Sequence, residues 1–153
     1  MEKINFYKHS IDESDIQNVT KTLRSVFLTT GPITKIFEEK FSKFTGIKHT
    51  VALNSCTAAL HLSLLALGIG NGDEVITTPL TFIATATAIL HTGATPVFVD
   101  VESTTGLINP NLIEKAITPK TKAIIPVHLY GAMTDMKRLR DIADTHNLNI
   151  IED

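Results

Sequence analysis

The chain has 153 residues, of which 43% are hydrophobic and 20% are charged, and its formal net charge is −2. This composition is typical of a soluble globular domain, and the charge gives no reason to expect nucleic acid or an anionic membrane as a partner. The single cysteine, Cys56, excludes an internal disulfide framework and favours a cytoplasmic setting, and the polar N-terminus lacks the apolar region of a signal peptide.

Two amphipathic helices are predicted in the first part of the chain. Residues 12–26 place apolar side chains at helical spacing behind Asp12, which is a suitable N-cap. Residues 27–32 contain a Gly-Pro pair, which predicts a loop. Residues 34–44 show helical spacing again. We therefore expect residues 1–48 to form an N-terminal helical segment that carries this loop.

Short apolar runs and helical stretches alternate along the rest of the chain. The runs that predict strands are residues 50–53, 74–77, 95–99, 123–127 and 148–151. The stretches that predict helices are residues 57–67, 81–91, 109–117 and 135–146. This alternation, with nearly continuous apolar strands, indicates a mainly parallel sheet with helices on both faces, an α/β fold. We expect it to occupy residues 49–153.

The segment after the first predicted strand has the composition of an anion site. Ligands of such sheets bind at the carboxyl ends of the strands. Ser55, Cys56 and Thr57 follow that strand and precede a helix that continues with two alanines. Small residues allow close approach of a ligand, and free N–H groups at a helix start bind anions. A phosphate could bind here, or Ser55 or Thr57 could serve only as the helix N-cap.

Two other patterns give weaker functional signals. The glycines of residues 68–74 resemble a dinucleotide-binding motif, but Asp73 stands where its third glycine is needed and the segment leads from a helix into a strand. A helix end with a tight turn is the better interpretation. The six histidines lack metal-ligand spacing, and only His128 follows a predicted strand, where it could be structural or could line a site.

Two further residues complete a set that would suit one ligand. Phe82 follows a predicted strand, at the start of a predicted helix and among small residues, so its ring could stack on a planar ligand or fill the core. Asp153 ends the last predicted strand, where it could pair with a cationic ligand atom or be a solvated chain end. A ligand with a phosphate, a flat ring and a ring cation would use all of these residues. Pyridoxal 5'-phosphate (PLP) has all three features.

Several segments of the chain resemble the DegT/DnrJ/EryC1/StrS family of PLP-dependent sugar aminotransferases. These segments are LTTGPITKIFEEKFSKFTG, ALNSCTAALHLSLLALGIGNGDEVITTPLTFIATATAIL, GATPVFVDV, AITPKTKAIIPVHLYGAMTDM and IIED. The resemblance covers nearly the whole chain. Within the family it is greatest for the UDP-4-amino-4-deoxy-arabinose branch, although related branches share much of the same sequence. It implies the large domain of a fold-type-I PLP aminotransferase, and residues 49–153 would be the first part of that domain.

The resemblance also implies roles in cofactor binding. Cys56 and Thr57 would bind the PLP phosphate. Phe82 would stack on the pyridine ring, and Asp153 would pair with the ring nitrogen. The Schiff-base lysine of the family follows the aspartate in sequence, so we expect it beyond residue 153 and no catalytic residue in this chain. We expect the 153-residue chain alone to have no transaminase activity.

The function that the resemblance implies is amino-group transfer to a nucleotide sugar. Thr29, Thr30 and Gly31 would border the pocket for the sugar-nucleotide substrate. The whole protein would be a cytoplasmic homodimer that transfers an amino group from glutamate to a UDP-4-keto sugar for cell-surface polysaccharide or lipopolysaccharide biosynthesis. Two alternatives stay open, which are a PLP-dependent sugar dehydratase of the same family and a non-catalytic truncated fragment.

Overall fold

The computed structural model describes residues 8–29 and 31–153. These residues fall into two compact units, divided between residues 52 and 53, and each unit is described by itself below. Among the residues so described, no helix combines the length and the apolar composition that crossing a membrane requires.

The first unit contains the two predicted helices. Helix α1 (Glu13–Leu23) begins with a capping box, in which Asp12 accepts a hydrogen bond from the N–H of Asp15 and the Asp15 carboxylate accepts one from the N–H of Asp12. Helix α2 (Pro32–Thr45) has proline at its first position and ends at Gly46, whose φ of 74° is the left-handed conformation that favours glycine. Both helix predictions are confirmed.

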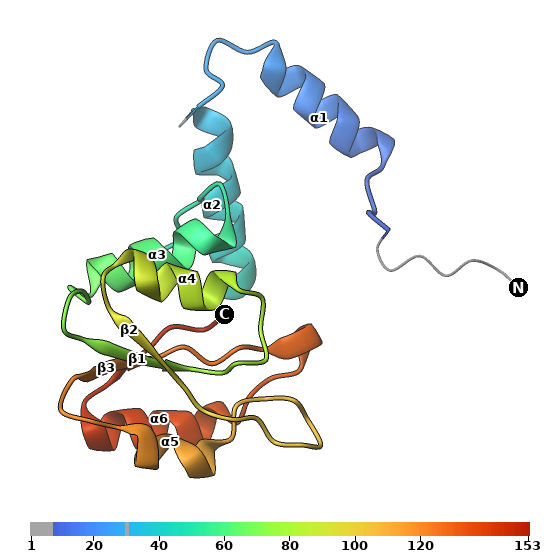
Figure 1. The fold of residues 1–153 in the computed structure, drawn as a ribbon. Coiled ribbons are helices and arrows are strands. Elements are labelled where there is room, and N and C mark those ends of the chain that lie inside the picture. Colours follow the sequence, from blue (N-terminus) through green and yellow to red (C-terminus); the bar gives the residue numbers. More distant parts are fainter. Residues whose placement is uncertain (1–7, 30) are drawn as a thin grey trace, which may run out of the picture. The chain divides into compact units, whose positions relative to one another are not determined.

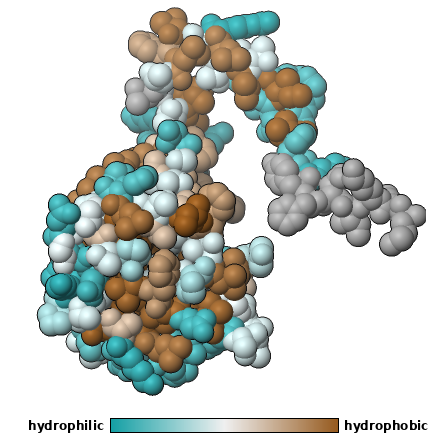
Figure 2. Space-filling model, in the orientation of Figure 1, coloured by the Kyte–Doolittle hydropathy of each residue, from teal (hydrophilic) through white to brown (hydrophobic). Residues whose placement is uncertain are grey.

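Neither helix of the first unit buries a side chain in the described structure. The exposed apolar side chains of these helices include Ile16, Val19, Leu23, Ile36, Phe37 and Phe41. Figure 2 shows hydrophobic residues in brown over both helices. Most of the stability of an amphipathic helix comes from packing its apolar face. The described residues of the first unit therefore leave the apolar faces of its own helices uncovered.

The second unit is built on a parallel sheet. Its strands are β1 (Glu74–Thr77), β2 (Thr95–Phe98), β3 (Thr121–Ile124) and β4 (Asn149–Ile150). They are hydrogen-bonded in the order β2-β1-β3-β4, and every neighbouring pair is parallel. The predicted run of residues 74–77 coincides with β1, and the runs of residues 95–99 and 148–151 contain β2 and β4. The run of residues 123–127 overlaps β3 only at residues 123–124, because this strand begins two residues earlier.

Helices cover both faces of this sheet (Figure 1). On one face, α3 (Cys56–Ala66) and α4 (Ala84–His91) bury Leu64 and Ile89 in a core with Val75 of β1. On the other face, α5 (Pro110–Ala116) and α6 (Met136–His146) pack in a second core with Ile76 and Ile124. Alternate residues of β1 thus point into opposite cores. The predicted α/β class, with a parallel sheet between helical layers, is confirmed.

The strand order locates the edge of the sheet where a ligand would bind. The chain moves from β1 to β2 on one side, and then passes back over β1 to place β3 and β4 on the other side. In open α/β sheets, the crevice at such a reversal lies at the carboxyl ends of the strands. Here that crevice lies between the ends of β1 and β3.

Two local predictions were wrong. Residues 50–53 were expected to be a strand but have no strand conformation. A strand needs a neighbour that completes its hydrogen bonds, and the described sheet pairs only β1 to β4 with one another. Phe82 was expected inside a helix, but α4 begins only at Ala84. The expected domain boundary, between residues 48 and 49, falls in the segment that joins α2 to α3.

The glycine-rich segment of residues 68–74 is a helix end and a turn, as predicted. Gly68 follows the end of α3 with a φ of 73°, and the N–H of Ile69 donates to the carbonyl of Leu64. This is the hydrogen-bond pattern of a helix that ends at a left-handed glycine. The segment therefore positions β1 and carries no dinucleotide-binding motif.

Gly93, in the turn before β2, offers a test of this packing. Its φ is 86°, and a Cβ atom there would overlap the side-chain amide of Asn71. We expect Gly93→Ala to lower the free energy of unfolding by more than about 1 kcal/mol, as measured by urea denaturation. Gly70→Ala is the matched control, because Gly70 has no positive φ and a Cβ there would approach only the Thr92 carbonyl, at 3.4 Å. Equal stability of the two variants would contradict the strain argument.

Candidate functional site

Asp153 lies at the carboxyl edge of the sheet because the pairing of β3 with β4 continues past the ends of both strands. The N–H of Ile151 donates to the Ile124 carbonyl at 3.0 Å, and the N–H of Asp153 donates to the Pro126 carbonyl at 3.0 Å. The N–H of His128 in turn donates to the Asp153 carbonyl at 2.8 Å. The N–H and the carbonyl of Asp153 are therefore both held by the segment that follows β3, next to the crevice between β1 and β3.

The half-buried carboxylate of Asp153 is contacted from two helices. The Thr85 hydroxyl, at the start of α4, donates to Oδ2 at 2.6 Å, and the Cys56 thiol, at the start of α3, lies 3.5 Å from Oδ1. Within residues 8–29 and 31–153, no lysine, arginine or histidine forms an ion pair with this carboxylate. A partly buried carboxylate that has hydrogen bonds but no cation suits a ligand that supplies the positive charge.

The start of α3 provides donors beside this carboxylate. Ser55 is the N-cap, and its hydroxyl accepts from the N–H of Ala58 at 3.1 Å. The capping interpretation is therefore confirmed for Ser55. The cap leaves the N–H groups of Cys56 and Thr57 without an acceptor among the described residues. Because α3 also directs the positive end of its dipole here, an anion would be stabilised at this position.

Phe82 is connected to the same place through Thr85. The Phe82 carbonyl accepts a hydrogen bond from the N–H of Thr85 at 3.2 Å. The hydroxyl of the same Thr85 contacts Asp153. The side chain of Phe82 is 78% exposed, so the interpretation of this ring as core filler was wrong. The structure thus brings Cys56, Phe82 and Asp153 to one edge of the sheet, and Thr57 adjoins Cys56.

The predicted substrate residues belong to the first unit. Thr29 is exposed, and Gly31 is half-buried and forms the N-cap of α2. Thr30 lies outside the described residues. The role of all three stays a prediction.

The hydrogen bonds of His128 favour a structural role for this residue over a role in lining the site. Its Nδ1 accepts from the N–H of Thr134 at 3.3 Å, so its Nε2 carries the hydrogen and donates to Glu152 at 2.9 Å. Both ring nitrogens are thereby used to hold the chain beside Asp153. Among the residues that the structure describes, no group of three metal-ligating side chains could hold a metal ion.

The sequence reasoning missed Thr85 as a partner of Asp153. It noted this residue only as a small neighbour of Phe82. The available signal was the pair Thr81 and Thr85, which have the i, i+4 spacing that can place two hydroxyls together at a helix start. Their oxygens are in fact 2.8 Å apart.

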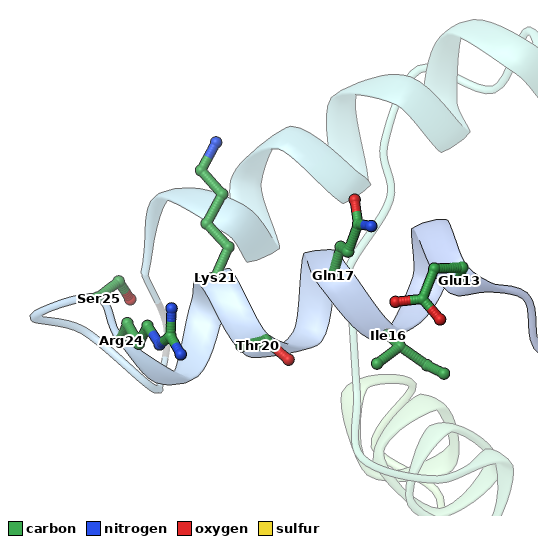
Figure 3. Close-up of a pocket in the computed structure, with 7 residues that line it drawn as sticks. All are labelled: Glu13, Ile16, Gln17, Thr20, Lys21, Arg24 and Ser25. Carbon is green, nitrogen blue, oxygen red and sulfur yellow. The ribbon is translucent and has the colours of Figure 1, made fainter.

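A hollow on α1 is a weaker candidate for a binding site. It is lined by Glu13, Ile16, Gln17, Thr20, Lys21, Arg24 and Ser25 (Figure 3). All of these residues come from one helix and the turn after it, and one helix cannot enclose a ligand in the way that functional pockets do. The edge around Asp153 combines donors, a ring and a carboxylate from several elements.

The pKa of the Cys56 thiol depends on its surroundings at this site. Partial burial raises its pKa, and the nearby negative charge of Asp153 and the hydrogen bond to it raise the pKa further. A raised pKa means less thiolate at a given pH, and thiolate is the form that alkylating reagents attack. We therefore expect Asp153→Asn to speed alkylation of Cys56 by iodoacetamide at about pH 8, measured by mass spectrometry of the peptide that contains Cys56. Asp141→Asn on α6 is the control, and an equal rate in both variants would contradict the effect of the Asp153 charge.

Comparison with known proteins identifies the family. The model of the DegT/DnrJ/EryC1/StrS aminotransferase family matches residues 9–153. The chain belongs to this family. The sequence resemblance is thus confirmed at the level of the family.

Relatives and solved structures of the DegT/DnrJ/EryC1/StrS family agree with this assignment. The spore coat polysaccharide biosynthesis protein SpsC of Bacillus subtilis is 53% identical over 94% of this chain and 37% of its own length. Spr1654 of Streptococcus pneumoniae, described as a sugar aminotransferase, has a solved structure in its PMP form. It is 41% identical to this chain with a TM-score of 0.93, and the match covers 99% of this chain and 42% of the Spr1654 chain. Helicobacter pylori PseC, an aminotransferase involved in pseudoaminic acid biosynthesis, is 32% identical with a TM-score of 0.91, over 99% and 41%. The chain therefore spans about two fifths of the length of the relatives it matches.

Proposed function

We propose that the whole protein to which this chain belongs is a PLP-dependent aminotransferase that transfers an amino group from glutamate to a UDP-4-keto sugar. The observation that carries the proposal is the Asp153 carboxylate, which lies beside the free N–H groups of α3 without a cation of its own. Family membership supports the same conclusion.

The residues at this edge fit PLP by their chemistry. The N–H groups of Cys56 and Thr57, with the Thr57 hydroxyl, would bind the phosphate. The exposed ring of Phe82 would stack on the flat pyridine ring. The Asp153 carboxylate would hold a proton on the ring nitrogen.

Each of these residues contributes to catalysis by binding or orientation. PLP, when bound, supplies an electron-withdrawing ring that stabilises negative charge on the carbon that carries the amino group. Asp153 would keep that ring charged, while the start of α3 and Phe82 would fix its direction. Three lysines of the second unit lie at the amino end of the sheet, Lys115 at the end of α5 and Lys120 and Lys122 at the start of β3. The fourth, Lys137, lies at the start of α6, on the face of the sheet opposite α3 and α4. We propose that the lysine that binds PLP lies in the sequence that follows Asp153.

The substrate and the setting are also part of the proposal. Thr29, Thr30 and Gly31 would border the sugar-nucleotide pocket, in a cytoplasmic homodimer. SpsC supports a product used for a surface polysaccharide, because its name assigns it to spore coat polysaccharide biosynthesis. Nucleotide-linked keto sugars are therefore the first substrates to test.

The test is product formation by the whole purified protein. The protein is incubated with PLP, glutamate and a UDP-4-keto sugar, and the amino sugar is detected by mass spectrometry. We expect a glutamate-dependent amino sugar and an equivalent amount of 2-oxoglutarate. A dehydrated keto sugar in place of the amino sugar would overturn the proposal, and turnover restricted to a TDP-linked sugar would overturn the choice of nucleotide.

A further inference from the structure

Two threonine hydroxyls form a chain that leads to the Asp153 carboxylate. The hydroxyl of Thr85 lies 2.6 Å from Asp153 Oδ2 and 2.8 Å from the hydroxyl of Thr81. Thr85 is only 1% exposed, so water does not compete for these contacts. Figure 1 shows the C-terminus close to α4, the helix that carries Thr85.

The direction of the hydrogen bonds in this chain follows from the number of available hydrogens. A threonine hydroxyl has one hydrogen, and a carboxylate has none to give. Thr85 therefore uses its hydrogen on Oδ2, since its other acceptor, the Phe82 carbonyl, is farther away at 3.3 Å. Thr81 must then be the donor to Thr85. Hydrogen bonds aligned in this way polarise and strengthen one another.

The chain sets the orientation of the carboxylate. With Oδ2 held by Thr85 on the α4 side, Oδ1 is turned toward the start of α3, where the Cys56 thiol lies 3.5 Å away. Oδ1 has only this weak thiol donor in the described structure, whereas Oδ2 already has a strong one. The oxygen that is free to pair with a ligand cation is therefore Oδ1, and its direction depends on Thr85.

We propose that Thr85 is a positioning residue that aims Asp153 Oδ1 at the ring nitrogen of the cofactor, and that Thr81 holds Thr85 in its donating orientation. This inference rests on the proposed function, because it assumes that a pyridine-based cofactor binds at this edge. It adds to that function a pair of threonine hydroxyls, of which Thr85 is buried and Thr81 is half-buried. The competing explanation is that Thr85 only tethers α4 to the end of β4.

Substitutions of Thr85 in the whole protein separate the two explanations. Thr85→Val keeps the shape and removes the hydroxyl, whereas Thr85→Ser keeps the hydroxyl. Thr87→Val is the matched control on α4, because the Thr87 hydroxyl contacts only the carbonyl of Ala84 within its own helix, at 3.2 Å. The measurements are the dissociation constant for PLP, the values of kcat and KM, the absorbance of bound PLP as a function of pH, and the melting temperature of the apoprotein.

For Thr85→Val we expect kcat to fall about tenfold with little change in KM for the sugar. The pH-dependent absorbance change of bound PLP should move to lower pH, because a misdirected carboxylate holds the ring proton less well. Thr85→Ser should restore both values, and Thr87→Val should match the wild type. Thr81→Val should give a change in the same direction of about threefold, which keeps the proposal testable if Thr85→Val does not fold.

Some results would overturn the proposal. If Thr85→Val lowers only the melting temperature of the apoprotein and leaves kcat and the absorbance profile unchanged, Thr85 is a tether. Failure of Thr85→Ser to restore the profile would show that side-chain shape matters and the hydroxyl does not. These results differ from failure of the proposed function, in which the wild-type protein itself binds PLP but aminates no keto sugar. In that case the absorbance profile still decides the role of Thr85. A wild-type protein that binds no PLP would overturn both the proposed function and the positioning role of Thr85.

Discussion

Asp153→Asn should lower the transaminase kcat of the whole protein by at least about a hundredfold. The substitution keeps the size of the side chain and an oxygen that can accept from Thr85, but it removes the negative charge. Without that charge the protonated ring nitrogen would lose its partner, because Asp153 is the carboxylate that contacts both α3 and α4 in the described residues. The electron-withdrawing power of the ring would fall accordingly.

The same variant should retain the cofactor phosphate. The N–H groups of Cys56 and Thr57 come from the α3 backbone, and their direction is set by the Ser55 cap. We therefore expect inorganic phosphate to compete with PLP equally well in Asp153→Asn and in the wild type. The measurement is kcat with glutamate, together with the phosphate inhibition constant for PLP binding.

Asp141→Asn is the control for this experiment. Asp141 is exposed on α6, on the opposite face of the sheet from α3 and α4. Its substitution makes the same change in net charge, so it accounts for any general electrostatic effect. Equal kcat values for the two variants would refute the role of Asp153 at the ring nitrogen.

The sequence predicted well the elements that have either two buried faces or clear capping residues at their ends. The run of residues 74–77 became β1 with the same boundaries, because its two apolar side chains, Val75 and Ile76, pack into the two opposite cores. The helices were recognised by their spacing and by their ends, such as the Asp12 capping box and Gly46. Burial supports the pattern in β1, whereas in α1 and α2, which bury no side chain, the local chemistry of the helix was sufficient.

The failures of prediction have a different cause. Residues 50–53 have the apolar composition of a strand, but a strand exists only where a neighbour supplies hydrogen bonds, and sequence pattern does not report neighbours. The contact of Thr85 with Asp153 joins residues that are 68 positions apart. The sequence indicated which edge of the sheet carries the site, but only the packing of α4 against the end of β4 revealed that a threonine holds the carboxylate.

Cys56→Pro should weaken PLP binding by about tenfold to a hundredfold relative to Cys56→Ala. Cys56 is the first residue of α3, a position where proline fits the helix and removes only one N–H group. Ser55 has the extended conformation that the residue before proline requires, with φ −162° and ψ 156°. A hydrogen bond to a charged group contributes about 1.5–3 kcal/mol, which corresponds to this range of affinity.

The comparison of these two variants isolates the backbone donor. Both variants lack the thiol, so any effect of losing its contact with Asp153 cancels. Pyridoxal, which has no phosphate, adds a second control, since its affinity should be equal in the two variants. If Cys56→Pro weakened pyridoxal and PLP by the same factor, the proline would be acting on the shape of α3. A loss restricted to PLP would place the phosphate at the N–H of residue 56, because no other part of the ligand differs between the two compounds.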